Sequence, residues 1–87
     1  MAKEMKRIAC APNEYTQIST GQANVVFRSF LTYGGRVAFG GTKPAAGTED
    51  YNDVLPGEAF ELGSLGVSDF LWYMPGKVAE TLQVIRG

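Results

Sequence analysis

Few residues in this chain could perform acid–base or nucleophilic chemistry. The chain has no histidine and a single cysteine, Cys10, so no thiol or hydroxyl nucleophile can be paired with an imidazole base. Lys6 and Arg7 could lower the pKa of the Cys10 thiol, although cysteines in small apolar settings are usually inert packing. Four carboxylates could converge in space as an acid–base pair: Glu58, Glu61, Asp69 and Glu80. No nucleophile motif accompanies them, so we expect a protein that is not an enzyme.

Two loops carry part of a ligand-binding pattern. The glycine pairs 34–35 and 40–41 are followed by Thr42-Lys43, the reverse of the Lys-Ser/Thr order of a phosphate loop, and no helix pattern follows. The acidic stretch 49–53 supplies oxygen ligands but lacks the alternating order of a calcium loop. With one cysteine and no histidine, the chain lacks the ligands from which zinc sites are usually built. We therefore expect no metal and no cofactor.

Aromatic residues offer a different chemistry, stacking on sugars or unpaired bases. The candidates are Tyr33, Tyr51, Trp72 and Tyr73. Basic residues do not cluster around them, and the adjacent Trp72 and Tyr73 would point to opposite faces of a strand. The pattern favours core packing for Trp72 and contact with a partner for Tyr73.

Length and composition limit how such residues can be positioned. The chain has 87 residues, 45% of them hydrophobic, which indicates one ordered domain with a small core. Since no intrachain disulfide is possible, we expect stability to be completed by self-association, as a dimer or trimer, or by docking on a larger body. The net charge of −1 argues against nucleic acid as partner, and no apolar run is long enough to cross a membrane. We expect a protein that is made in a cytoplasm-like compartment.

Short runs of β-branched and aromatic residues, separated by turn formers, predict six or seven strands. The expected fold is all-β: a small β-sandwich, or a jelly-roll-like fold or barrel. Residues 23–31 and 36–39 are predicted to form a hairpin through the turn Tyr33-Gly34-Gly35. Residues 40–52 have no periodicity and predict a long exposed loop.

The second half of the chain predicts three more strands, 58–62, 68–74 and 78–86. Pro-Gly pairs at 56–57 and 75–76 are typical of type II turns, and the second would join the last two strands as a hairpin. A helix over 78–86, through Val78, Leu82 and Ile85, is the alternative to a strand there. The first 12 residues are expected to be an arm that is strand-like near Ile8, preceding a domain of residues 13–87.

Several of these short segments together resemble small β-rich structural proteins of tailed bacteriophages. The segments are 37–41, 43–48, 55–58, 71–73 and 82–87. In that class a strand is followed by a Pro-Ala-rich loop, a Leu-x-Pro-Gly-Glu-like turn and a final hairpin. The charged arm, Lys3 to Arg7, has no counterpart in the class.

The resemblance implies a virion component on the capsid exterior, synthesised in the bacterial host cytoplasm, namely a decoration or cement protein that binds the major capsid protein. It brings no catalytic residues. We expect contacts with the partner from three places: the arm, the long loop and an exposed aromatic. The residues are Met5, Arg7, Ile8, Lys43, Tyr51 and Tyr73. A tail, neck or head-fibre component, and a module binding glycans or single-stranded nucleic acid, are the alternatives.

Overall fold

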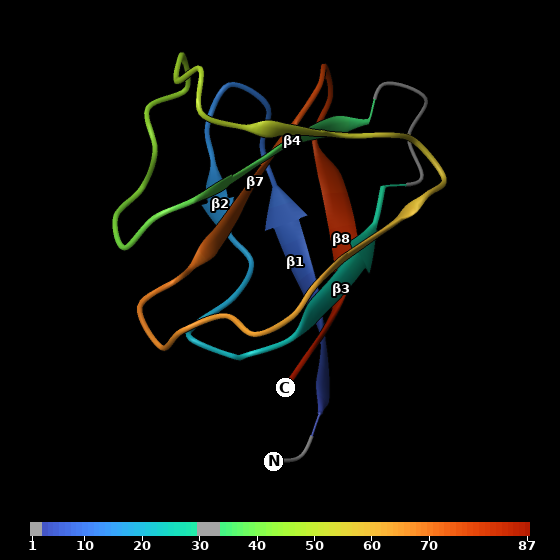
Figure 1. Ribbon diagram of the computed structural model, residues 1–87. Coiled ribbons are helices and arrows are strands. Elements are labelled where there is room, and N and C mark those ends of the chain that lie inside the picture. Colours follow the sequence, from blue (N-terminus) through green and yellow to red (C-terminus); the bar gives the residue numbers. More distant parts are fainter. Residues whose placement is uncertain (1–2, 30–33) are drawn as a thin grey trace.

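The computed structural model describes residues 3–29 and 34–87, and Tyr33 of the predicted turn therefore lies outside the described residues. Two antiparallel sheets of four strands pack face to face (Figure 1). The predicted all-β sandwich is confirmed, and the sheets do not close into a barrel. Within the described ranges no helix is long and apolar enough to span a membrane.

Each sheet contains strands from both ends of the chain. Sheet A has the order β1-β8-β3-β6 and sheet B the order β2-β7-β4-β5. The strands of sheet A are β1 (Glu4–Cys10), β8 (Glu80–Arg86), β3 (Val25–Arg28) and β6 (Ala59–Leu62). Those of sheet B are β2 (Thr16–Gln17), β7 (Leu71–Pro75), β4 (Gly35–Phe39) and β5 (Asn52–Val54).

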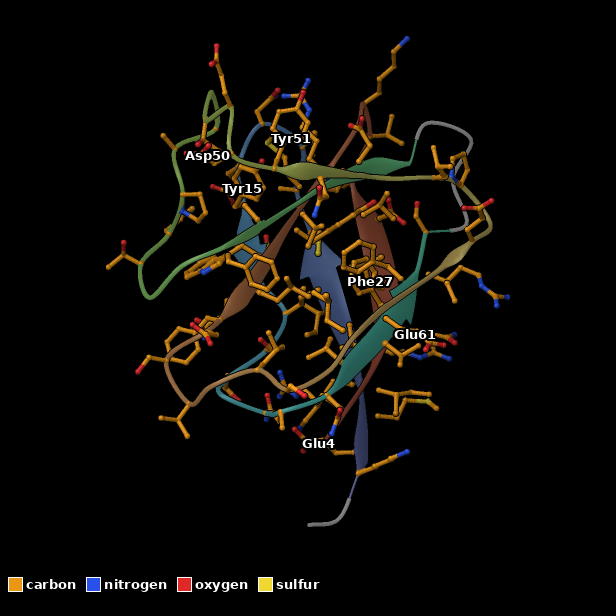
Figure 2. The ribbon with its side chains drawn as sticks, viewed as in Figure 1. Glu4, Tyr15, Phe27, Asp50, Tyr51 and Glu61 are labelled. Atoms are coloured by element: carbon orange, nitrogen blue, oxygen red, sulfur yellow. The ribbon has the colours of Figure 1, made fainter. Side chains whose placement is uncertain are left out.

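The main core lies between the sheets and follows from the alternation of side chains along each strand. In β8, Leu82 and Val84 are fully buried, whereas Ile85 is exposed, so the predicted strand is confirmed over the alternative helix. Phe27 lies at the centre of the core (Figure 2), where its ring packs on Phe60, with centroids 5.3 Å apart. The other buried members of this core are Cys10, Ile18, Val25, Val37, Val54, Leu71 and Tyr73.

Both predicted hairpins are wrong, because the two strands of each lie in different sheets. β3 pairs with β6 and β8, whereas β4 pairs with β5 and β7. Gly34 has a φ of 62°, as expected of a turn glycine, although no hairpin forms here. Its lack of a side chain lets the Val54 backbone lie close to it, because a Cβ there would overlap the Val54 carbonyl oxygen. A Cβ on Gly35 would overlap the hydroxyl of Tyr73. These glycines let neighbouring strands and a large side chain approach the backbone.

Only the first of the two Pro-Gly pairs forms the predicted type II turn. Gly57 has a φ of 79°, and the Glu58 amide donates to the Leu55 carbonyl at 3.4 Å, as a type II turn requires. Gly76 is not among the glycines of positive φ, and its amide donates to the Gly34 carbonyl at 3.0 Å. The chain therefore crosses from sheet B to sheet A after Pro75 and forms no hairpin.

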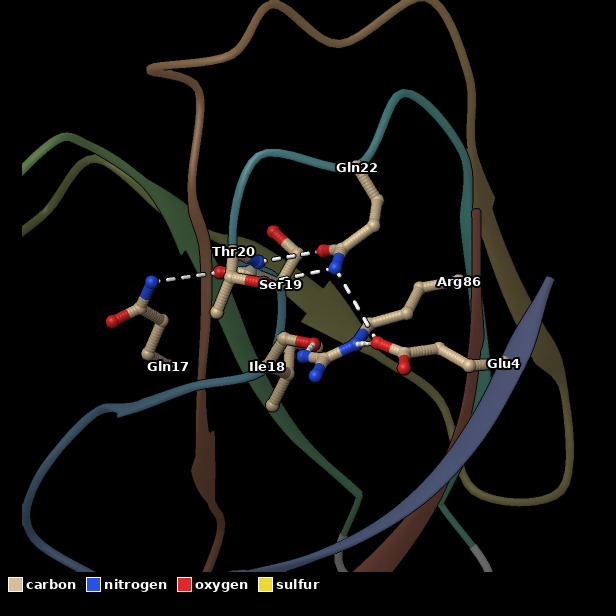
Figure 3. A network of polar contacts seen from close by, with 7 residues as sticks. All are labelled: Glu4, Gln17, Ile18, Ser19, Thr20, Gln22 and Arg86. Carbon is tan, nitrogen blue, oxygen red and sulfur yellow. Dashed lines mark hydrogen bonds and ion pairs between the residues drawn. The ribbon is translucent and has the colours of Figure 1, made fainter. Parts of the chain in front are cut away.

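Most of the predicted N-terminal arm belongs to the sandwich. β1 pairs with β8 along its whole length, from Glu4 opposite Arg86 to Cys10 opposite Glu80. At the start of the strand the Arg86 Nε donates to a Glu4 carboxylate oxygen at 2.7 Å, and its Nη1 donates to the Ile18 carbonyl at 3.1 Å (Figure 3). The strand predicted near Ile8 is present, and it is an edge strand of sheet A rather than an extension beyond the domain.

Sheet B has an apolar cluster on its outer face, in addition to the main core on its inner face. Tyr15, Ala38 and Met74 are buried there, and Tyr51 and Trp72 pack against them. Residues 40–51 have no regular strand, whereas the last residue of the predicted loop 40–52, Asn52, begins β5. The two sheets therefore differ, because sheet B has apolar packing on both faces.

Candidate docking surface

The outer face of sheet A carries exposed apolar side chains on neighbouring strands. In β1 and β8, Met5 lies opposite Ile85, and Ile85 in turn lies opposite Val26 of β3. Because residues directly opposite in antiparallel strands share a face, these three side chains form one continuous row. Glu61 of β6 ends the row. We call the row Met5–Ile85–Val26 the apolar row.

The apolar row is exposed although its residues are hydrophobic. Met5 is 65% exposed and Ile85 is 38% exposed, and Val26 is half-buried. The row borders a shallow hollow of about 200 Å³, whose lining also includes Arg28 and Gln83. An exposed apolar row across three paired strands is unlike single surface hydrophobics, and it is typical of a protein contact.

Charge surrounds the apolar row unevenly. The next row of the same face runs from Arg7 through Gln83 to Arg28, so two guanidinium groups stand beside the apolar side chains. The Arg7 guanidinium forms no hydrogen bond or ion pair with any residue in the described ranges. The face is thus apolar, with basic side chains along one side and Glu61 at the end beyond Val26, and its basic side suits a partner with acidic side chains.

The interior contains a polar cluster at the opposite end of β8. The Glu80 carboxylate accepts hydrogen bonds from the Tyr73 hydroxyl at 2.9 Å and from the Ser29 hydroxyl at 3.1 Å. Burial and the nearby Glu80 raise the pKa of the Cys10 thiol to about 11. Cys10 is thus a protonated core residue rather than a nucleophile at neutral pH. No group of three or more metal-ligating side chains comes together in the described part of the chain.

The described members of the candidate stacking set, Tyr51, Trp72 and Tyr73, do not lie together on one exposed face. Tyr73 is fully buried, and burial together with the neighbouring Glu80 carboxylate raises its pKa well above the ordinary range. Trp72 is half-buried on the outer face of sheet B, where its Nε1 donates to the Gly40 carbonyl at 2.9 Å. The ring of Tyr51 is half-buried, with the Arg36 guanidinium carbon 4.4 Å from its centroid. Sugars or bases would have to displace these contacts to stack there.

The predicted contact residues are divided among three places. Met5 and Arg7 lie on the outer face of sheet A, and Ile8 faces the main core and is half-buried. Lys43 is in the loop, where its Nζ lies 3.3 Å from a Glu14 carboxylate oxygen. Tyr51 packs against the apolar cluster on the outer side of sheet B.

The expectation for Tyr73 is wrong, because its side chain has no exposed surface with which to meet a partner. Alternation along β7 places Trp72 and Tyr73 on opposite faces of the strand. Because both faces are largely buried, alternation does not show which of the two residues faces the main core. Ile85 and Val26 were not predicted as contact residues. Their strands alternate correctly in the sequence, but only the register shows that they lie beside Met5.

A comparison of the chain with protein-family models, with curated proteins and with solved structures found no match. The surface itself must therefore indicate the class of function.

Proposed function

We propose that this chain is a non-enzymatic structural protein of a tailed-phage virion, a capsid decoration protein that binds the major capsid protein through the outer face of sheet A. The observation that carries the proposal is the exposed apolar row Met5–Ile85–Val26 beside Arg7. The phage assignment rests on the resemblance of the short sequence segments.

The physical case for docking comes from the asymmetry between the sheets. An 87-residue chain has a small core, and burying a further apolar side chain is worth roughly 1.5–3 kcal/mol. Anything that binds only the folded state adds to its stability. Repeated identical sites on a capsid lattice strengthen weak single contacts when the protein is itself a dimer or trimer.

The decisive experiment measures co-sedimentation of the purified protein with phage heads that lack it. We expect saturable binding at a fixed ratio to capsid subunits. The test variant is Ile85→Glu, which places a carboxylate in the apolar row while the backbone pairing of β8 stays intact. Losing the contact of one apolar side chain and burying a charge should weaken binding at least about tenfold.

The matched control is Val67→Glu, because Val67 is 82% exposed and lies outside every strand. It makes the same chemical change away from the proposed surface and should bind like the parent protein. Equal binding by Ile85→Glu and the parent would refute the docking face. Absence of any head binding would redirect the proposal to the tail or neck of the virion, and then to glycan or oligonucleotide screens.

A further inference from the structure

The free edge of β1 is a second feature that the fold leaves open. β1 pairs with β8 on one side only, and at seven residues it is the longest edge strand in the described chain. The other three edges are β6, β5 and β2, of four, three and two residues. A seven-residue edge is long enough to accept an added strand, whereas short edges discourage one.

The hydrogen-bond pattern shows which backbone groups of β1 point outward. Asn24 and Gly87 exchange both of their backbone hydrogen bonds, at 3.1 and 3.0 Å. Antiparallel ladders alternate between bonded and non-bonded pairs, so Ile85 also points its backbone groups toward β3. Arg86 and Val84 then point theirs toward β1.

The same alternation continues into β1. Glu4 and Lys6, opposite Arg86 and Val84, use their backbone groups within the sheet. The amide and carbonyl groups of Met5, Arg7 and Ala9 therefore point away from β8, to the free edge. Within residues 3–29 and 34–87 no hydrogen bond occupies these outward groups.

The side chains of the same three residues lie on the outer face of sheet A. An added strand would therefore place one side chain beside Met5, extending the apolar row, and another beside Arg7. Arg7 and Lys6 make a second copy of β1 a poor partner, because like charges would be brought together. A carboxylate opposite Arg7 turns that repulsion into attraction.

We infer that the edge of β1 accepts an extended segment of a partner protein, with an apolar residue opposite Met5 and an acidic residue opposite Arg7. The main-chain hydrogen bonds would hold the segment, and the two side-chain positions would select it. In this arrangement β1 receives a strand from the partner and does not itself add a strand to the partner's sheet. The inference does not depend on a capsid partner, because the outward main-chain groups of β1 can pair with an extended segment of any protein.

The test uses two capped synthetic peptides, Thr-Val-Glu-Thr-Ile-Thr and Thr-Val-Lys-Thr-Ile-Thr, with the full-length protein and no phage heads. In an antiparallel alignment their third residue faces Arg7 and their fifth faces Met5. Amide hydrogen exchange of each residue is followed by nuclear magnetic resonance. With half of the protein bound, the acidic peptide should slow exchange at Met5, Arg7 and Ala9 about twofold.

Two proline variants form a matched pair. Ala9→Pro removes an outward amide of β1, and proline is tolerated on edge strands. Ala59→Pro makes the same substitution in β6, at the other edge of sheet A. There Val25 and Phe27 point their backbone groups toward β6, which leaves the Ala59 amide outward by the same alternation. Only Ala9→Pro should reduce the protection that the acidic peptide gives at Met5 and Arg7.

The side-chain selection is tested by Arg7→Glu, which should reverse the preference between the two peptides. Equal protection by both peptides in the parent protein would overturn the inference, as would no protection at about 5 mM peptide. Protection that rises with protein concentration in the absence of peptide would place a second copy at the edge, and would equally overturn it.

Discussion

Cys10 gives a prediction that separates a packed thiol from a reactive one. The residue is 2% exposed, and burial raises the pKa of its thiol from 9.0 to about 11. In the unfolded chain the thiol loses its proton near its ordinary pKa. Above pH 9 the folded protein therefore holds a proton that the unfolded chain has released, so stability falls as the pH rises.

The size of the effect follows from the distance between the two pKa values. One pH unit corresponds to about 1.4 kcal/mol for a group charged in only one state. Between pH 8 and pH 11, Cys10 alone should thus remove about 2 kcal/mol from the free energy of unfolding. Cys10→Ala removes this contribution, at the cost of about 1 kcal/mol of packing at every pH.

The assay is urea denaturation of both proteins, with reductant present, at a series of pH values from 8 to 11. The parent protein should be the more stable at pH 8, and its advantage should disappear or reverse by pH 11. A constant difference across the series would refute the reasoning. Rapid reaction of Cys10 with a thiol reagent at pH 7 in the folded protein would do so as well, since a buried protonated thiol reacts slowly.

Three further substitutions test the packing, each by the shift in denaturation midpoint. Gly35→Ala should destabilise the protein by about 1–3 kcal/mol, because its Cβ would overlap the Tyr73 hydroxyl; a stability equal to the parent would contradict this close approach. Gly57→Ala meets no atoms within 4 Å, but its φ of 79° should cost about 1 kcal/mol, and a gain in stability would argue against the turn. Tyr73→Phe should lose about 1.5–3 kcal/mol with the hydrogen bond to Glu80, unless that bond is absent, in which case the change would be near neutral.

The sequence predicted six of the eight strands in the described part of the chain, missing the short strands β2 and β5, and it was insufficient for the pairing of the strands. Alternation of apolar and polar residues is a local property, so the strand over 80–86 and its buried Leu82 could be predicted. Glycine and proline mark where the chain turns. Whether the next strand then pairs with the previous one or crosses to the other sheet depends on distant packing, as at Gly35 beneath Tyr73.

The same limit applies to the candidate surface. Met5 and Arg7 could be proposed from the sequence because they stand in a charged segment near one end. Ile85 and Val26 needed the register of three strands before they could be assigned to the same patch. Tyr73 was misplaced because a strand that is apolar on both faces does not tell which face is turned to the main core.

Sheet B shows what a completed outer face looks like in this molecule. Tyr15 and Met74 are buried on it beneath partly buried aromatic rings, so the chain supplies its own cover. Sheet A has apolar side chains at Met5 and Ile85 in the equivalent layer, and no described segment covers them. The chain covers the outer face of sheet B itself. The exposed apolar side chains on the outer face of sheet A therefore fit our proposal that a partner protein covers them. A partner that reaches Met5 also reaches the free edge of β1, and Arg7 belongs to both surfaces.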